Sequence, residues 1–214
     1  LLRTGYHAKS EAVLGLRGDR EAAVSMLPSR PLQGQGFDGK IRQFDQWLQD
    51  LGTPDIDASL YLMFLLAATS TVGYSTSHAL VCGTLCHIMA REFRLPGNER
   101  NALVRAALTM NIGMTALQDE LAVQREHPTA EQQEAIKSHP EDSMLLLERR
   151  LSDDQLWVDV VGQHHASIAE RVPLAQQEPI DRLTRVLGTI DRYAAMISPR
   201  KSRAGRSATD SVRA

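Results

Sequence analysis

The sequence has little of several residue types, and each scarcity excludes a class of protein. Only two of the 214 residues are cysteine, too few for a disulfide framework, so we expect reduced, intracellular chemistry. Aromatic residues make up 5% of the chain, too few for the stacking platforms of proteins that bind single-stranded nucleic acid. The net charge is −2, so no positive excess directs the whole chain to a nucleic acid polymer or an anionic membrane.

Long apolar runs are also absent. The longest, residues 60–68, is about half the length that a bilayer span requires. No basic stretch followed by an apolar one opens the sequence, as a secretory signal would require. We therefore predict a cytoplasmic protein without a membrane span. Because the first residue is Leu1 rather than methionine, we expect a piece of a longer chain.

Helix signals dominate what is present. Apolar residues recur at spacings of three and four within 38–51, the amphipathic pattern of a helix. We predict further helices at 75–94, at 98–110 capped by Asn98, at 129–139 opened by a capping box from Thr129 to Gln132, and at 141–151, 153–166 and 178–197. The sequence thus predicts an all-α helical bundle.

The chain divides into three parts by composition. Two prolines and two glycines between residues 27 and 37 indicate a linker, so residues 1–37 form an N-terminal segment and 38–198 the helical domain. Residues 199–214 form a basic tail with five cations and one carboxylate. Such a tail is either solvated or able to hold phosphates, and the sequence leaves both interpretations open.

Four histidines and one aspartate are the candidate chemical residues. They are His78, His139, the adjacent pair His164 and His165, and Asp191, which lies within an apolar helix. A buried carboxylate needs a partner. If these side chains converge in the bundle, they suit a borderline metal such as iron, manganese or zinc. The alternative is that they are scattered core histidines satisfied by ordinary hydrogen bonds.

The order of these residues extends beyond single letters. His78 is followed by Asn111-Ile112-Gly113, then His139-Pro140, the His164-His165 pair, and Ile190-Asp191-Arg192-Tyr193-Ala194 with Arg200 downstream. This order resembles the HD-GYP family of the HD-domain phosphohydrolase superfamily over residues 57–203. The resemblance implies an HD-domain-like helical bundle and a metal-dependent phosphodiesterase acting on the bacterial messenger cyclic di-GMP.

Several residues depart from the family pattern. The signature His-Asp doublet is Met110-Asn111, and the lysine that follows it in the family is Met114. The family glutamate one helical turn before the first histidine is Tyr74, and residues 166–174 contain no Gly-Tyr-Pro loop. A two-metal hydrolase needs anionic ligands to hold two cations and generate hydroxide. We therefore expect no catalytic residues and either no metal or one divalent ion (Fe, Mn or Zn) in a vestigial site.

Two further sets of residues are candidate ligands. By the resemblance, Arg200 and Arg203 match family positions that grip phosphates, which makes them candidates for binding cyclic di-GMP. His78, Cys82 and Cys86 are spaced four apart. Strung along about 12 Å of helix, these three cannot meet at one ion, so we predict that both cysteines are buried packing residues.

Three functional hypotheses follow. The first is a catalytically silent HD-GYP-like signalling module that acts through protein contact in bacterial cyclic di-GMP pathways, with a diguanylate cyclase domain as one possible partner. The alternative is a divergent metal-dependent phosphohydrolase that acts on cyclic di-GMP or another phosphoester. A weaker third hypothesis is a sensor that binds cyclic di-GMP through Arg200 and Arg203.

Overall fold

The computed structural model describes residues 36–51, 73–150, 153–167, 172–201, 205 and 207–212. Across these residues the regular structure is helical and no strand occurs, which confirms the all-α prediction. The first 35 residues, the apolar run at 60–68 and Arg203 lie outside the described residues. None of the described helices is both long and apolar enough to cross a membrane.

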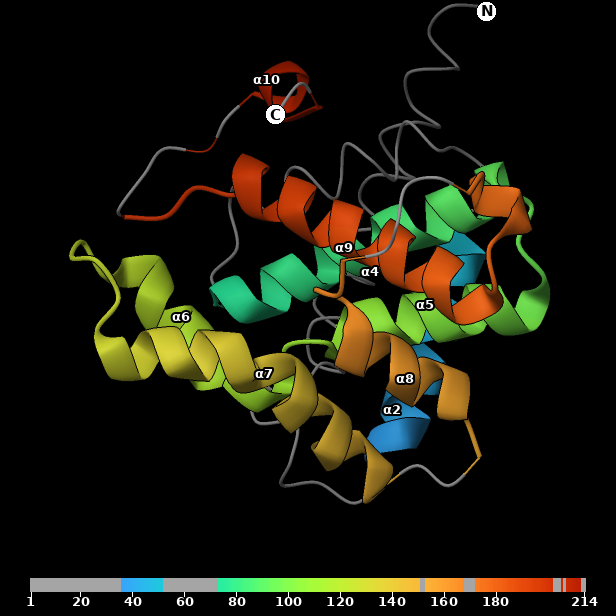
Figure 1. The fold of residues 1–214 in the computed structure, drawn as a ribbon, viewed down its shortest axis with the longest axis horizontal. Helices are drawn as coiled ribbons and strands as arrows, with labels where there is room; N and C mark the ends of the chain where they lie inside the picture. Colours follow the sequence, from blue (N-terminus) through green and yellow to red (C-terminus); the bar gives the residue numbers. More distant parts are fainter. Residues whose placement is uncertain are drawn as a thin grey trace, which may run out of the picture.

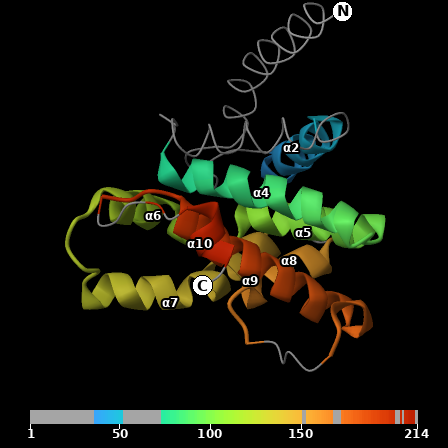
Figure 2. The same cartoon turned by 90° about the horizontal axis from the view of Figure 1, so that it is seen from above.

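The helices pack as a bundle around one central member (Figures 1 and 2). In chain order the α-helices are α2 (Phe37–Leu51), α4 (Tyr74–Glu92), α5 (Gly97–Thr109), α6 (Thr115–Val123), α7 (Ala130–Glu148), α8 (Gln155–Gln163), α9 (Pro179–Ile197) and α10 (Ala208–Val212). Two 3₁₀ turns, η1 (Ile112–Met114) and η2 (Leu174–Gln176), connect some of them. Helix α5 contacts α2, α4, α8 and α9.

The centre of α5 is built from small and branched apolar residues. Ala102, Leu103, Val104, Ala106 and Ala107 are each at most 1% exposed. Alanines at successive turns let neighbouring helices approach closely, and propensity favours them in a helix. Figure 2 shows α4 lying along α5. The core therefore holds α5 from several sides, and its neighbours fix the positions of the candidate ligands.

The periodic pattern of 38–51 predicted α2 correctly. Phe37, Ile41, Phe44 and Leu48 are at most 5% exposed and share the face that contacts α4 and α5. The capping box is confirmed as well. The Thr129 side chain accepts the Gln132 N–H, and the Gln132 side chain accepts the Thr129 N–H.

Two predicted boundaries are wrong. Asn98 does not cap its helix, because α5 already begins at Gly97 with Pro96 as the preceding residue. More importantly, Pro140 does not end a helix, and α7 continues through it from Ala130 to Glu148. A proline inside a helix removes one N–H and frees the carbonyl four residues earlier, here that of Ile136. This carbonyl has a partner in the site described below.

Candidate metal centre

The five candidate ligands converge from four helices. His78 lies on α4, His139 on α7, His164 and His165 at the end of α8, and Asp191 on α9. His78, His139 and His164 are at most 3% exposed. The side chains form two neighbouring groups, His139–His164–His165 and His78–Cys82–Asp191, in each of which the ligand atoms lie within 4.8 Å of one another.

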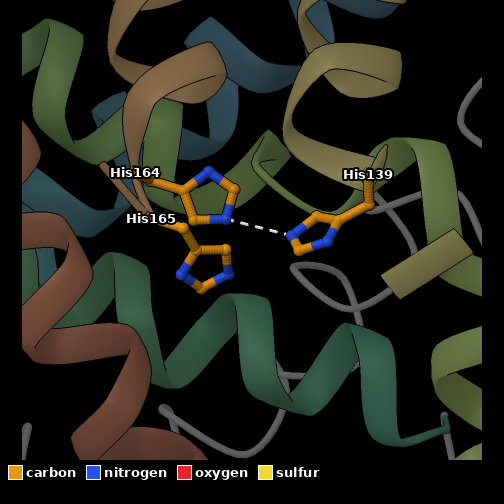
Figure 3. A group of neighbouring side chains, drawn as sticks. All are labelled: His139, His164 and His165. Atoms are coloured by element: carbon orange, nitrogen blue, oxygen red, sulfur yellow. Dashed lines mark hydrogen bonds between the residues drawn. The ribbon is translucent and has the colours of Figure 1, made fainter. Parts of the chain in front are cut away.

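His139 and His164 point their Nε2 atoms at each other (Figure 3). The two nitrogens are 3.1 Å apart. On the far side of each ring, Nδ1 faces a backbone carbonyl, at 2.5 Å for His139 and Ile136 and at 2.6 Å for His164 and Val161. A carbonyl can only accept a hydrogen bond, so both Nδ1 atoms carry hydrogen.

These two carbonyls are available for identifiable reasons. Pro140 removes the N–H that would otherwise occupy the Ile136 carbonyl within α7. Val161 lies in the last turn of α8, where helix carbonyls lack intrahelical partners. The His139-Pro140 dipeptide and the position of His164 at the helix end therefore fix each ring with Nε2 turned inward.

Both imidazoles are held in their neutral form. Burial lowers the pKa of His139. Burial and the neighbouring His165 lower the pKa of His164 to about 4. With hydrogen on both Nδ1 atoms, each Nε2 then presents a lone pair to the other. Two such lone pairs at 3.1 Å repel unless a cation or a proton lies between them.

Asp191 connects the two groups. Its Oδ1 lies 2.8 Å from His78 Nε2 and its Oδ2 lies 3.9 Å from His165 Nε2. Burial alone would raise the pKa of this carboxyl, but the hydrogen bond and charge of His78, with smaller electrostatic contributions from His164 and His165, lower it to about 2. Asp191 is therefore an anion beside the histidines at neutral pH.

A glycine on α9 allows this approach. A β-carbon at Gly188 would lie 2.5 Å from the carbonyl oxygen of His164, closer than such contacts allow. Only glycine lets the α9 backbone touch the end of α8 here. Asp191, three residues further on, shares the side of α9 on which Gly188 makes this contact.

The residues at the predicted doublet positions have other surroundings. Met110 is 1% exposed and belongs to the hydrophobic core. Asn111 lines a cavity with Phe37 and Ile41, and its backbone carbonyl accepts from the Met114 N–H and the Thr115 hydroxyl. A thioether and a neutral amide supply no negative charge to the centre.

Tyr74 and Arg200 form a stack over His78. The Tyr74 ring lies 5.7 Å from the His78 ring at an interplanar angle of 14°. The Arg200 guanidinium lies 4.7 Å from the Tyr74 ring centre and donates to its hydroxyl at 2.8 Å. Burial raises the pKa of Tyr74, although Arg200 opposes the shift. Tyr74 is thus neutral, and Arg200 already has a hydrogen-bond partner in its hydroxyl.

Sequence reasoning missed a second set of buried polar residues. Asp45 of α2 pairs with Arg100 and Arg105 of α5, and Arg105 also pairs with Asp154 at the start of α8. Arg182 of α9 donates to both carboxylate oxygens of Glu99. These charges are spread over the sequence and look like surface residues, so no local pattern could have found them.

The donor set fits a divalent transition metal ion. Neutral imidazoles whose Nδ1–H is held by a backbone carbonyl are the usual metal-binding form of histidine. Around a tetrahedral ion with N–metal bonds of about 2.05 Å, two nitrogens lie about 3.4 Å apart, so the His139–His164 gap needs to open only slightly. No model of a known protein family matches this chain, and no curated protein matches it at a significant level.

Proposed function

We propose that this chain is a catalytically silent signalling module similar to HD-GYP domains, with a divalent metal ion at His139, His164 and His165 next to Asp191. The single observation that carries the proposal is that the two Nε2 atoms face each other at 3.1 Å while each Nδ1 faces a backbone carbonyl. A helical core has no need of this arrangement, because rotating either ring would relieve the repulsion. A bound cation would turn the repulsion into two coordination bonds.

The ligand chemistry supports iron, manganese or zinc. Three imidazoles and a nearby carboxylate are borderline donors, which suit these ions better than magnesium or calcium. His165 has a side chain that is 43% exposed, so an ion at this group can be reached from solvent. Its role here would be to bind the metal and to fix the end of α8 against α7 and α9.

Catalytic silence follows from the missing anions. When bound, two metal ions bridged by a carboxylate would generate a hydroxide near neutral pH. In this chain Asn111 and Tyr74 bring no charge, and Met114 cannot neutralise a phosphate. What the sequence keeps is the helical core and the histidines. Those features support a function through protein contact in bacterial cyclic di-GMP signalling, where a diguanylate cyclase domain is one candidate partner.

Hydrolysis of cyclic di-GMP tests the proposal. We expect no turnover from the manganese- or iron-loaded protein, because the bridging carboxylate is missing. The variant Met110→His/Asn111→Asp restores the doublet, and turnover only in that variant would support a silent relative of the hydrolases. Turnover by the unmodified protein that disappears in His164→Ala would contradict silence and favour the phosphohydrolase alternative.

Nucleotide binding separates the module from a sensor. Because Arg200 already donates to Tyr74, we expect no heat of binding when cyclic di-GMP is titrated into the unmodified protein. Tyr74→Ala releases the guanidinium and is the variant most able to gain affinity. Binding by the unmodified protein that is lost in Arg200→Met would establish a sensor instead.

A further inference from the structure

Cys82 belongs to a second group of candidate ligands, beside the three histidines. It lies one helical turn after His78 on α4, so the two side chains share a helix face. Its Sγ is 3.5 Å from His78 Nε2, the same nitrogen that Asp191 Oδ1 approaches at 2.8 Å from α9. Cys86, one turn further along, is not a member of this group.

We propose that His78, Cys82 and Asp191 form a second cation site, selective for a thiophilic ion such as Zn²⁺ and distinct from the three-histidine site. This inference goes beyond the proposed function, because it uses a different ligand group. The site also includes an anionic ligand that the HD-GYP pattern does not contain. In that pattern the negative charge comes from carboxylates, whereas here a Cys82 thiolate would carry the same single negative charge.

The distances suit zinc. With a Zn–N bond of about 2.05 Å and a Zn–S bond of about 2.3 Å, tetrahedral geometry separates nitrogen and sulfur by about 3.6 Å. The structure has 3.5 Å between His78 Nε2 and Cys82 Sγ. The nitrogen–oxygen distance of 2.8 Å is that of a hydrogen bond and must lengthen by about 0.6 Å for the same ion.

Binding would replace a proton by the ion. The S–H bond of Cys82 breaks as the S–Zn bond forms, and that proton leaves to solvent. The His78 Nε2 proton, which faces the Asp191 carboxylate at 2.8 Å, is exchanged through solvent for one on the unpartnered Nδ1, so that Nε2 can bind the ion. Soft thiolate donors select zinc over magnesium or calcium. The ion would then have one thiolate, one carboxylate and one neutral imidazole, so its two positive charges are balanced.

The position of the site indicates a structural role. Cys82 is 0% and His78 is 2% exposed. The Tyr74 ring stacks on His78, and the Arg200 guanidinium lies over the Tyr74 ring. The ligands come from α4 and α9, 113 residues apart in sequence. A zinc ion here would clamp these two helices without presenting a metal-bound hydroxide to a substrate.

Cobalt substitution provides the test, because a Co²⁺–thiolate bond gives an intense near-ultraviolet charge-transfer band and Co²⁺–histidine bonds do not. The probe is Co²⁺ alone, added to the reduced full chain under nitrogen. The key variant is Cys82→Ala, and the matched control is Cys86→Ala, which removes an equally buried sulfur from the same helix. Circular dichroism checks that each variant is folded.

We expect the band in the unmodified protein and in Cys86→Ala, its loss in Cys82→Ala, and its displacement by stoichiometric Zn²⁺. A band that survives in Cys82→Ala, or no band in unmodified protein that binds Co²⁺, would overturn the proposal. Should Cys82→Ala fail to fold, His78→Gln in the intact-cysteine background must weaken the band. The variant His139→Ala/His164→Ala separates the two sites, because it removes the three-histidine ion and leaves the thiolate band.

Discussion

Two buried polar clusters in this molecule differ in how completely their charged and hydrogen-bonding groups are paired within the protein. Around Asp45, each charge meets an opposite one: the carboxylate accepts from Arg100 and Arg105, and Arg105 continues to Asp154. Around His139 and His164, the two Nε2 atoms have only each other. The first cluster is complete with protein groups alone. The second needs a cation or a shared proton between its two nitrogens, and that difference marks it as the candidate binding site.

The difference also appears in what surrounds each cluster. The Asp45 network joins α2, α5 and the start of α8, and its ionic groups compensate one another. In the histidine cluster the carbonyls of Ile136 and Val161 face the rings, and only glycine at position 188 allows α9 to approach the end of α8 this closely. These contacts orient the Nε2 atoms of His139 and His164 toward each other, and two facing lone pairs repel in a way that an ordinary hydrophobic core avoids.

The largest expected effect comes from breaking the complete cluster. Asp45→Asn leaves Arg100 without a carboxylate partner and Arg105 with Asp154 alone, and removing one partner of a buried pair costs about 3–5 kcal/mol. Urea denaturation should show a loss of that size. Asp38→Asn, an exposed position on the same helix, is the control and should change stability by less than about 0.5 kcal/mol. Equal losses in both variants would contradict a structural role for the Asp45 network.

The next largest effect concerns the orientation of the His139 ring. Pro140→Ala restores an N–H that competes for the Ile136 carbonyl, so the His139 ring loses its fixed orientation. Loss of such an outer partner lowers metal affinity about 10- to 100-fold, while the helix itself should not be weakened. Competition with a chromogenic zinc chelator measures the affinity in a Cys82→Ala background. An unchanged affinity would mean that the proline has no part in positioning the ring.

A smaller effect is the pH dependence of stability at His87, which lies outside the metal centre. Burial, with the charges of Arg100 and Arg91, lowers the pKa of His87 to about 4, against about 6.5 in the unfolded chain. Between these two pH values the unfolded state therefore binds a proton at His87 that the native state does not bind. Stability should fall as the pH drops from 6.5 to 4, by at most about 1.4 kcal/mol per pH unit from this residue.

His87→Gln removes that proton while keeping a group that can accept from Arg100. Denaturation at several pH values should give a shallower decline than in the unmodified protein. Exposed His127 provides the control, and His127→Gln should leave the slope unchanged. If His87→Gln had the same slope as the unmodified protein, the assignment of this decline to His87 would be wrong.

The smallest effect is expected far from both clusters. Thr129→Ala removes the side chain that caps α7, which costs about 1 kcal/mol. Metal affinity should not change, because His139 lies more than two turns further along the helix. Thermal denaturation and the chelator assay measure the two quantities separately. A loss of affinity without a loss of stability would show that the start of α7 controls the site.

The sequence predicted those features that depend on local chemistry. The apolar spacing of 38–51 predicted α2, and Thr129 with Gln132 predicted the start of α7. The grouping of His78, His139, His164, His165 and Asp191 came from their order along the chain, and the structure brings all five side chains together. The metal itself and the cyclic di-GMP pathway remain proposals.

The features that were missed depend on long-range contacts. Pro140 looks like a helix end, because nothing local shows that the surrounding bundle keeps α7 continuous. Spacing along α4 relates Cys82 only to residues on its own helix, whereas Asp191, the other member of its group, comes from α9. The partners of Asp45 lie 55 and 60 residues away. Spacing on one helix cannot reveal these arrangements.

The central claim is that the facing nitrogens of His139 and His164 hold a cation. Elemental analysis of the Cys82→Ala variant, purified without chelator and without air, tests it most directly, because that background removes the thiolate site. The account predicts about one iron, manganese or zinc ion per chain, lost when His164→Ala is added and retained with His127→Ala. Absence of metal, together with no uptake of added Zn²⁺ or Mn²⁺ by the folded protein, would contradict it.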